Sequence, residues 1–378
     1  MVMKSVLIFK DNILPASETF ILSQGEGLTT FKAFYVGARK VDGIAVPAGR
    51  SLFINDGGRF GRFREILFKA FDHVSAKQLA TLRRIGASLI HAHFGPDGVL
   101  AQPLAKALQL PLVVTFHGYD ATTHDDFASR SFFKHRKYLR RRGRLIESAA
   151  KFIAVSEFVK RKIMAQGFPE EKIVVLYTGI DLEAFRPSAQ VLRKPMVLFV
   201  GRLVSVKGCS YLIRAMQRVQ ESFPEVELVI IGDGPLRSQL EQEARASLNH
   251  YRFLGVQPPQ VVREWLNQAK VFSVPSITEE SGAAEGFGMV FAEAQAMGVP
   301  VVSSLSGGIP EAVAHGETGL LAAERDVEGL AAHILRLLTD ENLWSLMSAQ
   351  GQKRVADRFD LRRQTVLLDE IYREVCGW

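Results

Sequence analysis

Two glutamates eight positions apart, Glu285 and Glu293, mark the stretch whose residue types point most clearly to chemistry. The segment between them contains glycine and then turns apolar. This pattern predicts a loop, a helix and, after a stop at Gly298, a buried strand at 299–302. The N-terminal end of a helix binds anions through free N–H groups and the helix dipole. Two carboxylates beside an anion site suit a ligand that carries both phosphates and hydroxyl groups, such as a nucleotide sugar.

A second group of polar residues follows an expected strand at 196–200. Arg202 and Lys207 lie in the segment 201–208, which begins and ends with glycine and precedes a helical pattern. The planar fork of an arginine and the point charge of a lysine together suit a diphosphate. A solvated loop with two surface cations is the alternative interpretation of this segment taken alone.

Short β-branched runs alternate with helical patterns through both halves of the chain, which is typical of parallel sheets covered on both faces. In such sheets, ligands lie beyond the carboxyl ends of the strands. The loops expected there are 91–98, 116–120, 201–208 and 232–235. The expected strands are 6–9, 89–91, 112–115 and 152–155, followed by 196–200, 227–231, 251–254, 271–274 and 299–303.

A change of composition at 178–195 predicts a linker between two domains. We therefore expect an α/β fold with two doubly wound domains, 1–183 and 184–360, and a cleft between them as the default place for a ligand. The last segment, 361–378, is helical in pattern and could run back across the hinge to the first domain.

The composition bounds the class of protein. The 378 residues are 47% hydrophobic and 23% charged, which suffices for two globular domains. A net charge of +7 permits anionic membranes, nucleic acid or phosphorylated substrates and does not choose among them. Two cysteines, Cys209 and Cys376, indicate neither a disulfide framework nor a metal cluster and fit the cytoplasm. We expect no signal peptide, since the N-terminal apolar run is too short, and no membrane span.

Three motifs occur in a fixed order: Arg202 with Lys207, Glu285 with Glu293, and Gly307-Gly308-Ile309-Pro310-Glu311. This order resembles family 4 of the retaining glycosyltransferases, also called glycosyltransferase group 1. Members of this family have the GT-B fold. The similarity covers most of the chain, including the linker motif at 177–185 and short motifs at 253–255 and 274–276. It implies two Rossmann-like domains that face each other across a cleft. The first would take the acceptor, and the second would bind the nucleotide-sugar donor.

The resemblance also implies roles for individual residues in the second domain. Arg202 and Lys207 would bind the donor diphosphate and assist catalysis. Glu293 would accept hydrogen bonds from the ribose hydroxyls, while Glu285 would face the transferred sugar as a catalytic residue. Backbone N–H groups would contact sugar and phosphate at Phe287, Gly288, Met289 and Val290. From the residues alone, Glu293 could instead be an exposed helix residue and Glu285 a charge favoured by the helix dipole.

In the first half, His117 directly follows an expected strand. The family places a histidine here, near the donor sugar, so His117 is a catalytic candidate and Asp120 a supporting one. If their strand continues, His91 and His93 point to the same face and could share a metal. No third ligand is evident, so hydrogen-bonded structural histidines are favoured, and neither a metal nor another cofactor is expected.

The acceptor side is less explicit. Gly95 and Asp97 are weaker site candidates in the loop 91–98. The first β–α loop lacks the Gly-Gly pair that many family members carry there, and with 91–98 it resembles the subgroup of colanic acid and related exopolysaccharide synthesis. Ser17 and Glu18 in this loop are candidates for acceptor binding. A purely capping role, with Ser17 at the helix N-cap and Glu18 in the first turn, is the alternative.

Two basic stretches bear on the partner. The run 134–144 is densely basic, and 59–71 mixes arginines with four phenylalanines. A basic helix flanked by aromatics fits the inner face of an anionic membrane and would attract a lipid diphosphate. A solvated basic face is the alternative. Nucleic acid is disfavoured because no known binding module accompanies the charge.

These observations predict retaining, metal-independent transfer of a hexose from a nucleotide sugar to a saccharide in the synthesis of a surface polysaccharide. The expected acceptor is lipid-linked, for example to polyprenyl diphosphate. The resemblance favours UDP-glucose or UDP-galactose and leaves GDP-mannose open, and the linkage and oligomeric state are not specified. No second carboxylate is placed as a nucleophile, so front-face substitution is favoured. The alternatives are a nucleotide-sugar 2-epimerase of the same fold and a non-catalytic nucleotide-sugar-binding protein. A dehydrogenase is disfavoured because no Gly-x-Gly-x-x-Gly follows the first strand.

Overall fold

The computed structural model describes residues 3–15, 18–130, 133–188 and 190–378. The chain forms two compact units. Unit 1 comprises residues 1–179 together with 361–378, and unit 2 comprises residues 180–360. The division therefore falls four residues before the expected boundary, and the C-terminal segment belongs to the first unit.

In its described part, unit 1 contains a seven-stranded parallel sheet with the order β3-β2-β1-β4-β5-β6-β7. Strand order reverses between β1 and β4, and ligands of doubly wound sheets bind beyond the carboxyl ends of the strands at such a switch point. The strands are β1 (Lys4–Ile13), β2 (Phe31–Lys40), β3 (Ser51–Asn55), β4 (Ala87–His93), β5 (Leu112–Phe116), β6 (Lys151–Ala154) and β7 (Ile173–Val175).

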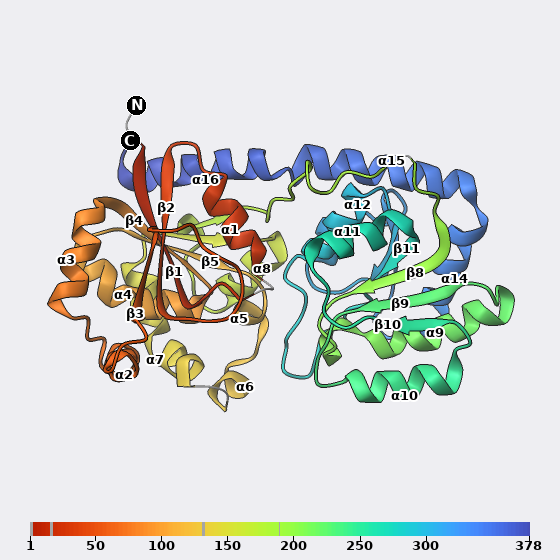
Figure 1. Cartoon of the computed structure of the whole chain (residues 1–378), viewed down its shortest axis with the longest axis horizontal. Coiled ribbons are helices and arrows are strands. Elements are labelled where there is room, and N and C mark those ends of the chain that lie inside the picture. The colour runs from red at the N-terminus through yellow and green to blue at the C-terminus, as the bar shows by residue number, and fades with distance from the viewer. Residues whose placement is uncertain (1–2, 16–17, 131–132, 189) are drawn as a thin grey trace. The chain divides into compact units, whose positions relative to one another are not determined.

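Helices cover both faces of this sheet (Figure 1). They are α1 (Thr19–Glu26), α2 (Gly61–Phe71), α3 (Ala76–Ile85), α4 (Gly95–Leu108), α5 (Tyr119–Thr122), α6 (Asp125–Ser129), α7 (Phe133–Ser148), α8 (Glu157–Ala165) and the C-terminal α16 (Leu361–Cys376). A 3-10 turn at Glu170–Lys172 precedes β7.

Helix α16 is part of the core of unit 1. Tyr372 is fully buried and meets the ring of Phe31 edge-on, with 5.2 Å between ring centroids. The Asp369 carboxylate accepts hydrogen bonds from the backbone N–H groups of Thr29 and Thr30 and from the Thr29 hydroxyl. One buried aromatic ring and one buried carboxylate oxygen that accepts three hydrogen bonds therefore anchor α16 in unit 1.

Unit 2 contains, within the described residues, a six-stranded parallel sheet with the order β10-β9-β8-β11-β12-β13 and its switch point between β8 and β11. Its strands are β8 (Lys194–Val200), β9 (Glu227–Ile231), β10 (Tyr251–Phe253), β11 (Ala269–Ser273), β12 (Val301–Ser304) and β13 (Gly319–Ala322). Its helices are α9 (Cys209–Ser222), α10 (Arg237–Ser247), α11 (Pro259–Gln268), α12 (Met289–Ala296), α13 (Ile309–Ala312), α14 (Val327–Thr339) and α15 (Glu341–Arg358), with a 3-10 turn at Ser205–Lys207.

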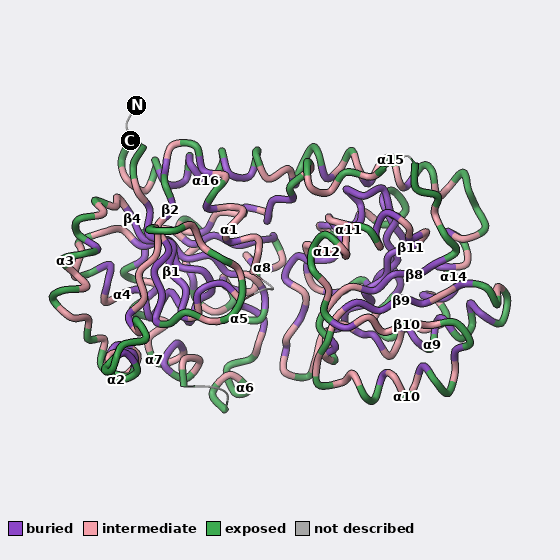
Figure 2. Tube along the Cα trace, viewed as in Figure 1, coloured by how far each residue is buried: buried purple, intermediate pink, exposed green. Residues whose placement is uncertain are grey.

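The middle parts of the central strands are apolar because helices cover both faces of each sheet, and Figure 2 shows them buried. Phe9 in β1, Phe199 in β8 and Phe272 in β11 are fully buried. The expected fold class, two doubly wound α/β domains, is confirmed. Across the described chain, no helix combines the length and apolar character needed to cross a membrane.

Candidate functional site

In unit 2, the loop after β8 brings Lys207 against the segment that precedes α12. Lys207 Nζ lies 2.5 Å from a carboxylate oxygen of Glu285, and the Ser276 hydroxyl donates to the same oxygen at 3.5 Å. The side chains of Lys207 and Glu285 are 21% and 14% exposed, so the pair is reachable by a ligand. Gly208 follows with φ +66°, and an added Cβ would lie 1.9 Å from the Pro275 carbonyl oxygen. Only glycine allows this close approach.

The Gly307–Gly308 motif supports the backbone of Glu285 from the other side. The Gly308 N–H donates to the Glu285 carbonyl at 2.8 Å. Gly307 has φ +55°, and a Cβ there would lie 2.2 Å from the same carbonyl oxygen. The motif therefore fixes the position of Glu285 through main-chain contact, and a larger residue at Gly307 would displace it.

Arg202 lies in the same loop, but the structure does not bring it to Lys207. Its side chain is exposed and makes no ion pair or hydrogen bond with any residue that the structure describes. A flexible exposed guanidinium at the carboxyl end of β8 is available to an incoming anion.

Helix α12 begins at Met289, after Gly288 in a left-handed conformation with φ +81°. The predicted helix start is therefore present, and the first N–H groups of a helix have no acceptor within the helix, which favours an anion. Phe287 buries its ring against Phe359, with centroids 5.0 Å apart, which leaves its backbone as the part that could contact a ligand. Met289 and Val290 are half-buried.

Glu293 lies in the second turn of α12 and is half-buried, so it is not the exposed helix residue of the alternative interpretation. Burial raises the pKa of its carboxyl group to about 7, although the positive charge of Arg263 opposes the shift. Such a carboxyl group is costly to ionise unless a ligand supplies hydrogen-bond donors. Ribose hydroxyl groups are donors of this kind.

In unit 1, the buried histidines His91 and His93 of β4 lie next to the half-buried His117, which directly follows β5. His91 is hydrogen-bonded at both ring nitrogens, to the Tyr372 and Thr115 hydroxyl groups at 2.6 Å each. His93 Nδ1 lies 3.1 Å from His117 Nε2. Burial lowers the pKa of His91 to about 3 and holds the pKa values of His93 and His117 well below their usual range. All three imidazoles are therefore neutral at neutral pH.

His91 thus has a structural role, since both of its nitrogens are occupied. His117, by contrast, is packed between the rings of Phe20 and Phe94, at centroid distances of 4.9 and 4.6 Å. Among the described residues no group of three or more histidine, cysteine or acidic side chains could hold a metal ion.

Asp120 holds the backbone around His117. Its carboxylate accepts hydrogen bonds from the N–H groups of His117 at 3.1 Å, Gly118 at 3.0 Å and Gly95 at 2.9 Å. Burial raises the pKa of Asp120 against the lowering effect of these donors. Backbone N–H groups occupy both carboxylate oxygens of Asp120. The side chain therefore holds the His117 loop in place. Gly95 has a packing role, since an added Cβ would lie 2.6 Å from the ring of Phe116.

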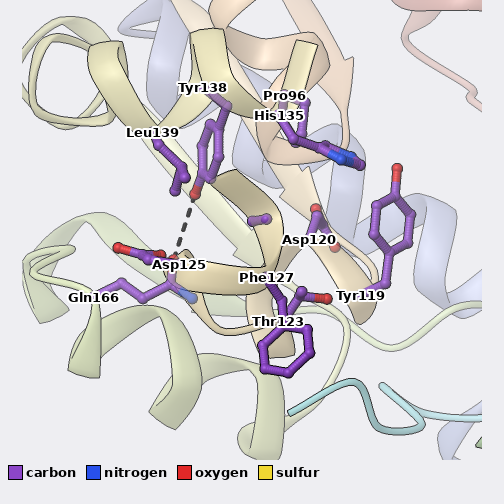
Figure 3. A pocket seen from close by; sticks show the side chains of 11 residues that line it. Pro96, Tyr119, Asp120, Thr123, Asp125, Phe127, His135, Tyr138, Leu139 and Gln166 are labelled. Carbon is purple, nitrogen blue, oxygen red and sulfur yellow. Dashed lines mark hydrogen bonds between the residues drawn. The ribbon is translucent and has the colours of Figure 1, made fainter. Parts of the chain in front are cut away.

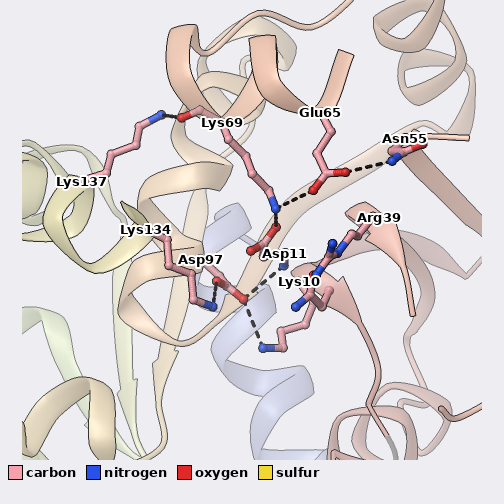
Figure 4. Close-up of polar contacts among 10 residues, drawn as sticks. Lys10, Asp11, Arg39, Asn55, Glu65, Lys69, Asp97, Lys134 and Lys137 are labelled. Atoms are coloured by element: carbon pink, nitrogen blue, oxygen red, sulfur yellow. Dashed lines mark hydrogen bonds and ion pairs between the residues drawn. The ribbon is translucent and has the colours of Figure 1, made fainter. Parts of the chain in front are cut away.

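A buried charged cluster lies in the C-terminal part of β1, at the sheet's switch point (Figure 4). Lys10 lies 3.2 Å from Asp97 and 3.2 Å from Glu18, and Lys134 reaches Asp97 at 3.4 Å. Asp97 has no exposed surface and also accepts a hydrogen bond from the Asp11 N–H. Burial opposes its ionisation, but Lys10 and Lys134 outweigh this effect and hold the pKa of Asp97 below its usual range.

The cluster continues through Asp11 to Lys69 at 2.7 Å and from Lys69 to Glu65 at 2.8 Å. Lys10, Asp11 and Lys69 were not predicted from the sequence. The signal that could have found them is the pair Lys10-Asp11, which interrupts an otherwise apolar strand.

Glu18 differs from its predicted place. It stands at the N-cap of α1 and not in the first turn, and its side chain makes no capping hydrogen bond because it turns to Lys10. Its second carboxylate oxygen is buried and has no hydrogen-bond partner in the part of the chain that the structure describes. Burial raises its pKa against the effect of Lys10. Ser17 lies outside the described residues.

A cavity of about 250 Å³ lies in unit 1 beside the His117 loop (Figure 3). Aromatic side chains of α5, α6 and α7 border it, namely Tyr119, Phe127, His135 and Tyr138. Its polar groups include Gln166, which hydrogen-bonds with Tyr138 at 3.5 Å, and Asp125, which forms a bidentate pair with Arg142 at 2.8 and 2.7 Å. The wall therefore offers aromatic faces together with polar groups already held in place.

Comparison with known proteins identifies related sequences over most of the chain. The family model described as Glycosyl transferases group 1 matches residues 181–354, and the one described as Glycosyltransferase Family 4 matches residues 41–184. The chain is 33% identical over 291 residues to the amylovoran biosynthesis glycosyltransferase AmsK of Erwinia amylovora, covering 75% of this chain and 68% of that protein. It is 30% identical over 283 residues to WcaL of Salmonella typhimurium, a protein assigned to colanic acid biosynthesis as a glycosyltransferase, covering 72% of this chain and 67% of the other.

A solved structure shares the fold. Alr3699/HepE of Anabaena, solved in complex with UDP and glucose, superposes with a TM-score of 0.75 over 98% of this chain and 100% of that chain, at 21% identity. This likeness over nearly the whole chain confirms the predicted GT-B fold of two Rossmann-like domains.

Proposed function

The chain belongs to the glycosyltransferases of group 1 and family 4, and we propose that it transfers a hexose from a UDP-sugar to a saccharide acceptor with retention of anomeric configuration. UDP-glucose and UDP-galactose are the proposed donors. The process we infer is the synthesis of an exopolysaccharide, because the relatives AmsK and WcaL are named for amylovoran and colanic acid biosynthesis.

One observation supports a donor-binding site in unit 2. Lys207 and Glu285 meet beside the N-terminus of α12, where main-chain N–H groups and the helix dipole favour an anion. We infer that Lys207 and Arg202 hold the diphosphate, that Glu285 meets the sugar hydroxyls, and that Glu293 accepts hydrogen bonds from the ribose. The backbone at 287–290 would complete the contacts to sugar and phosphate.

Departure of UDP leaves negative charge on the diphosphate, and fixed positive charge stabilises that change electrostatically. Lys207, Arg202 and the end of α12 supply such charge, so we infer that transfer needs no divalent metal. We further infer a front-face substitution, in which the departing phosphate takes the proton of the acceptor hydroxyl while that oxygen bonds to the anomeric carbon. A glycosyl-enzyme ester detected by intact-mass measurement would contradict this mechanism.

For the acceptor, we infer a site in unit 1 that includes His117 and the cavity bordered by Tyr119 and Phe127. Aromatic faces pack against the apolar face of a sugar ring, and the neutral imidazole of His117 can bind a hydroxyl group. We infer that the acceptor is linked to polyprenyl diphosphate, so that the enzyme works at the inner face of a membrane. The free cysteines Cys209 and Cys376 fit such a reducing compartment.

Donor turnover with and without acceptor tests this function. The protein should consume UDP-glucose or UDP-galactose with added lipid-linked saccharide and transfer the sugar as an α-glycoside, visible by NMR, with a rate unchanged by EDTA. Conversion of the nucleotide sugar without acceptor would identify an epimerase instead. Binding without any turnover would identify a non-catalytic binding protein, and preference for GDP-mannose would correct the donor.

A further inference from the structure

Helix α2 exposes a row of large apolar side chains. It buries Gly61, Glu65 and Phe68 and turns Phe63 and Ile66 outward, with exposed fractions of 58% and 53%. Phe60, just before the helix, and Phe71, its last residue, are 62% and 73% exposed. Clustered exposed aromatics are rare on a surface that meets only water, and they mark an interaction site.

Helix α7 carries cations that the fold does not use. Arg136, Arg140 and Arg144 recur at four-residue intervals, so they lie along one side of the helix. All three are exposed, and none forms an ion pair or a side-chain hydrogen bond with the rest of the described chain. Like charges at this spacing destabilise a helix, so an external anion would relieve a repulsion already present.

The two helices are fixed side by side through Asp72, the C-cap residue of α2. Lys137 Nζ donates to the Asp72 carboxylate at 2.5 Å and to the Lys69 carbonyl at 2.7 Å, and Arg141 forms a second ion pair with Asp72. These contacts involve Lys137 and Arg141, the cations on the side of α7 that faces α2. The arginines on its outer side stay exposed next to the apolar row of α2.

A cavity of about 420 Å³ lies between the helices. It is lined by Ala70, Phe133, Lys137, Arg140, Arg141 and Arg144. A basic cavity with an apolar border accommodates a phosphate group that carries a hydrocarbon chain, which is the chemistry of an anionic lipid.

We propose that the α2–α7 face, formed by Phe60, Phe63, Ile66, Phe71, Phe133, Arg136, Arg140 and Arg144, docks unit 1 onto an anionic lipid bilayer. The phenylalanines enter the headgroup region, and the arginines bind lipid phosphates. The exposed apolar side chains of α2 argue against nucleic acid as the partner. Nucleic acid would bind the arginines through its phosphates and would leave Phe63 and Ile66 without a partner. The inference rests on the proposed function only for the presence of a membrane-bound acceptor.

The experiment measures co-sedimentation of the full chain with vesicles, without donor or acceptor. One set of vesicles is pure phosphatidylcholine and the other contains phosphatidylglycerol. We expect binding to the anionic vesicles, weaker binding to neutral ones, and a decrease with added salt. Each arginine near an anionic surface strengthens binding about fivefold. The variant Arg140→Glu/Arg144→Glu should therefore lose at least about tenfold, and Phe63→Ser/Ile66→Ser a similar factor.

Matched variants control for general charge and hydrophobicity. Arg161→Glu/Arg245→Glu reverses two exposed arginines elsewhere, and Leu192→Ser/Val256→Ser removes two apolar side chains that are 86% and 71% exposed. Both should bind like the wild type. Equal losses in face and control variants, equal binding to neutral and anionic vesicles, or tighter binding to single-stranded RNA than to vesicles would each overturn the proposal.

UDP binding and thermal melting of the same variants separate the two proposals. The face variants should keep the wild-type melting temperature and UDP affinity, which shows that they fold. A wild-type chain that binds vesicles but not UDP would refute the proposed function and leave the docking surface intact.

Discussion

Lys207 Nζ lies 2.5 Å from a carboxylate oxygen of Glu285, so the cation proposed to hold the donor diphosphate is paired in this structure with the carboxylate proposed to meet the sugar. The pair joins two loops 78 residues apart in the sequence. A diphosphate carries more negative charge than one carboxylate. It can therefore form an ion pair with Lys207 in place of the pair between Lys207 and Glu285. This exchange would free the Glu285 carboxylate to accept hydrogen bonds from the sugar.

The first prediction concerns Lys207. A charge-assisted hydrogen bond contributes about 1.5–3 kcal/mol, so Lys207→Ala should weaken UDP binding by roughly 10- to 100-fold in calorimetry. Lys207→Arg should lose less because it keeps the charge. The control is Lys194→Ala, which removes an exposed lysine of unit 2 that contacts Gln268. Equal UDP affinity in the two alanine variants would refute a diphosphate contact by Lys207.

The second prediction uses the raised pKa of Glu293, about 7 against 4.5 for an unperturbed glutamate. Between these two pH values the folded chain keeps a proton that the unfolded chain has lost, so stability falls as pH rises from 4.5 to 7 and then levels off. The slope is at most about 1.4 kcal/mol per pH unit, and partial exposure reduces it.

Glu293→Gln removes this penalty. Its melting temperature relative to the wild type should therefore be higher at pH 8 than at pH 5. Glu280→Gln, at an exposed position of the same unit, should show no such change. A difference between wild type and Glu293→Gln that is constant across this pH range would mean that the Glu293 carboxyl group is not desolvated.

The third prediction concerns the His117 loop. The amide of an asparagine has only one acceptor oxygen for the three backbone donors that Asp120 satisfies. Asp120→Asn should lower kcat, with little change in UDP affinity, and should destabilise the fold by about 1–3 kcal/mol. The matched change Asp126→Asn, on the exposed helix α6, should leave both quantities unaltered. Wild-type kcat in Asp120→Asn would show that the loop does not need this support.

The fourth prediction concerns the buried cluster at the end of β1. Asp97→Ala leaves Lys10 buried with fewer partners, which should cost about 3–5 kcal/mol in the free energy of unfolding. The double change Lys10→Met/Asp97→Leu should cost less than the sum of its two single changes, because it removes both charges. Glu328→Ala, which breaks an exposed pair with Arg218, serves as the control and should have no measurable effect. Additive single changes would mean that Lys10 and Asp97 are not coupled.

The sequence predicted strands such as β1, β8 and β11 from their apolar parts, because burial on both faces makes those parts continuously apolar. The edge strands β3, β7 and β13 were not predicted, whereas the edge strand β10 was. β2 was also not predicted, because lysines, an arginine and Gly37 break its apolar pattern. Gly37 is required there, as a Cβ would lie 2.6 Å from the Lys10 carbonyl oxygen. The strand after α12 starts at Val301 and not at Val299, following the turn at Gly298 and Pro300.

Site residues that share a local motif could be found from the sequence, whereas their partners could not. The N-terminus of α12 could be predicted from the glycines before Met289 and the apolar run after it. The contact of Lys10 with Asp97 joins residues 87 positions apart, through the pairing of β1 with β4, and leaves no periodic signal. Asp120 was predicted as a supporting residue of His117 because it lies three positions away, but the sequence does not reveal that Gly95 donates to the same carboxylate.

The most direct measurement compares UDP binding and sugar transfer in Glu285→Gln. The change frees Lys207 from its partner, so UDP should bind as tightly as to the wild type or more tightly. Transfer from UDP-glucose or UDP-galactose should fall by about 100-fold or more, because an interaction with the reacting sugar is lost. A Glu285→Gln protein that keeps full transfer activity, or that loses UDP affinity together with activity, would contradict the separate roles assigned to Lys207 and Glu285.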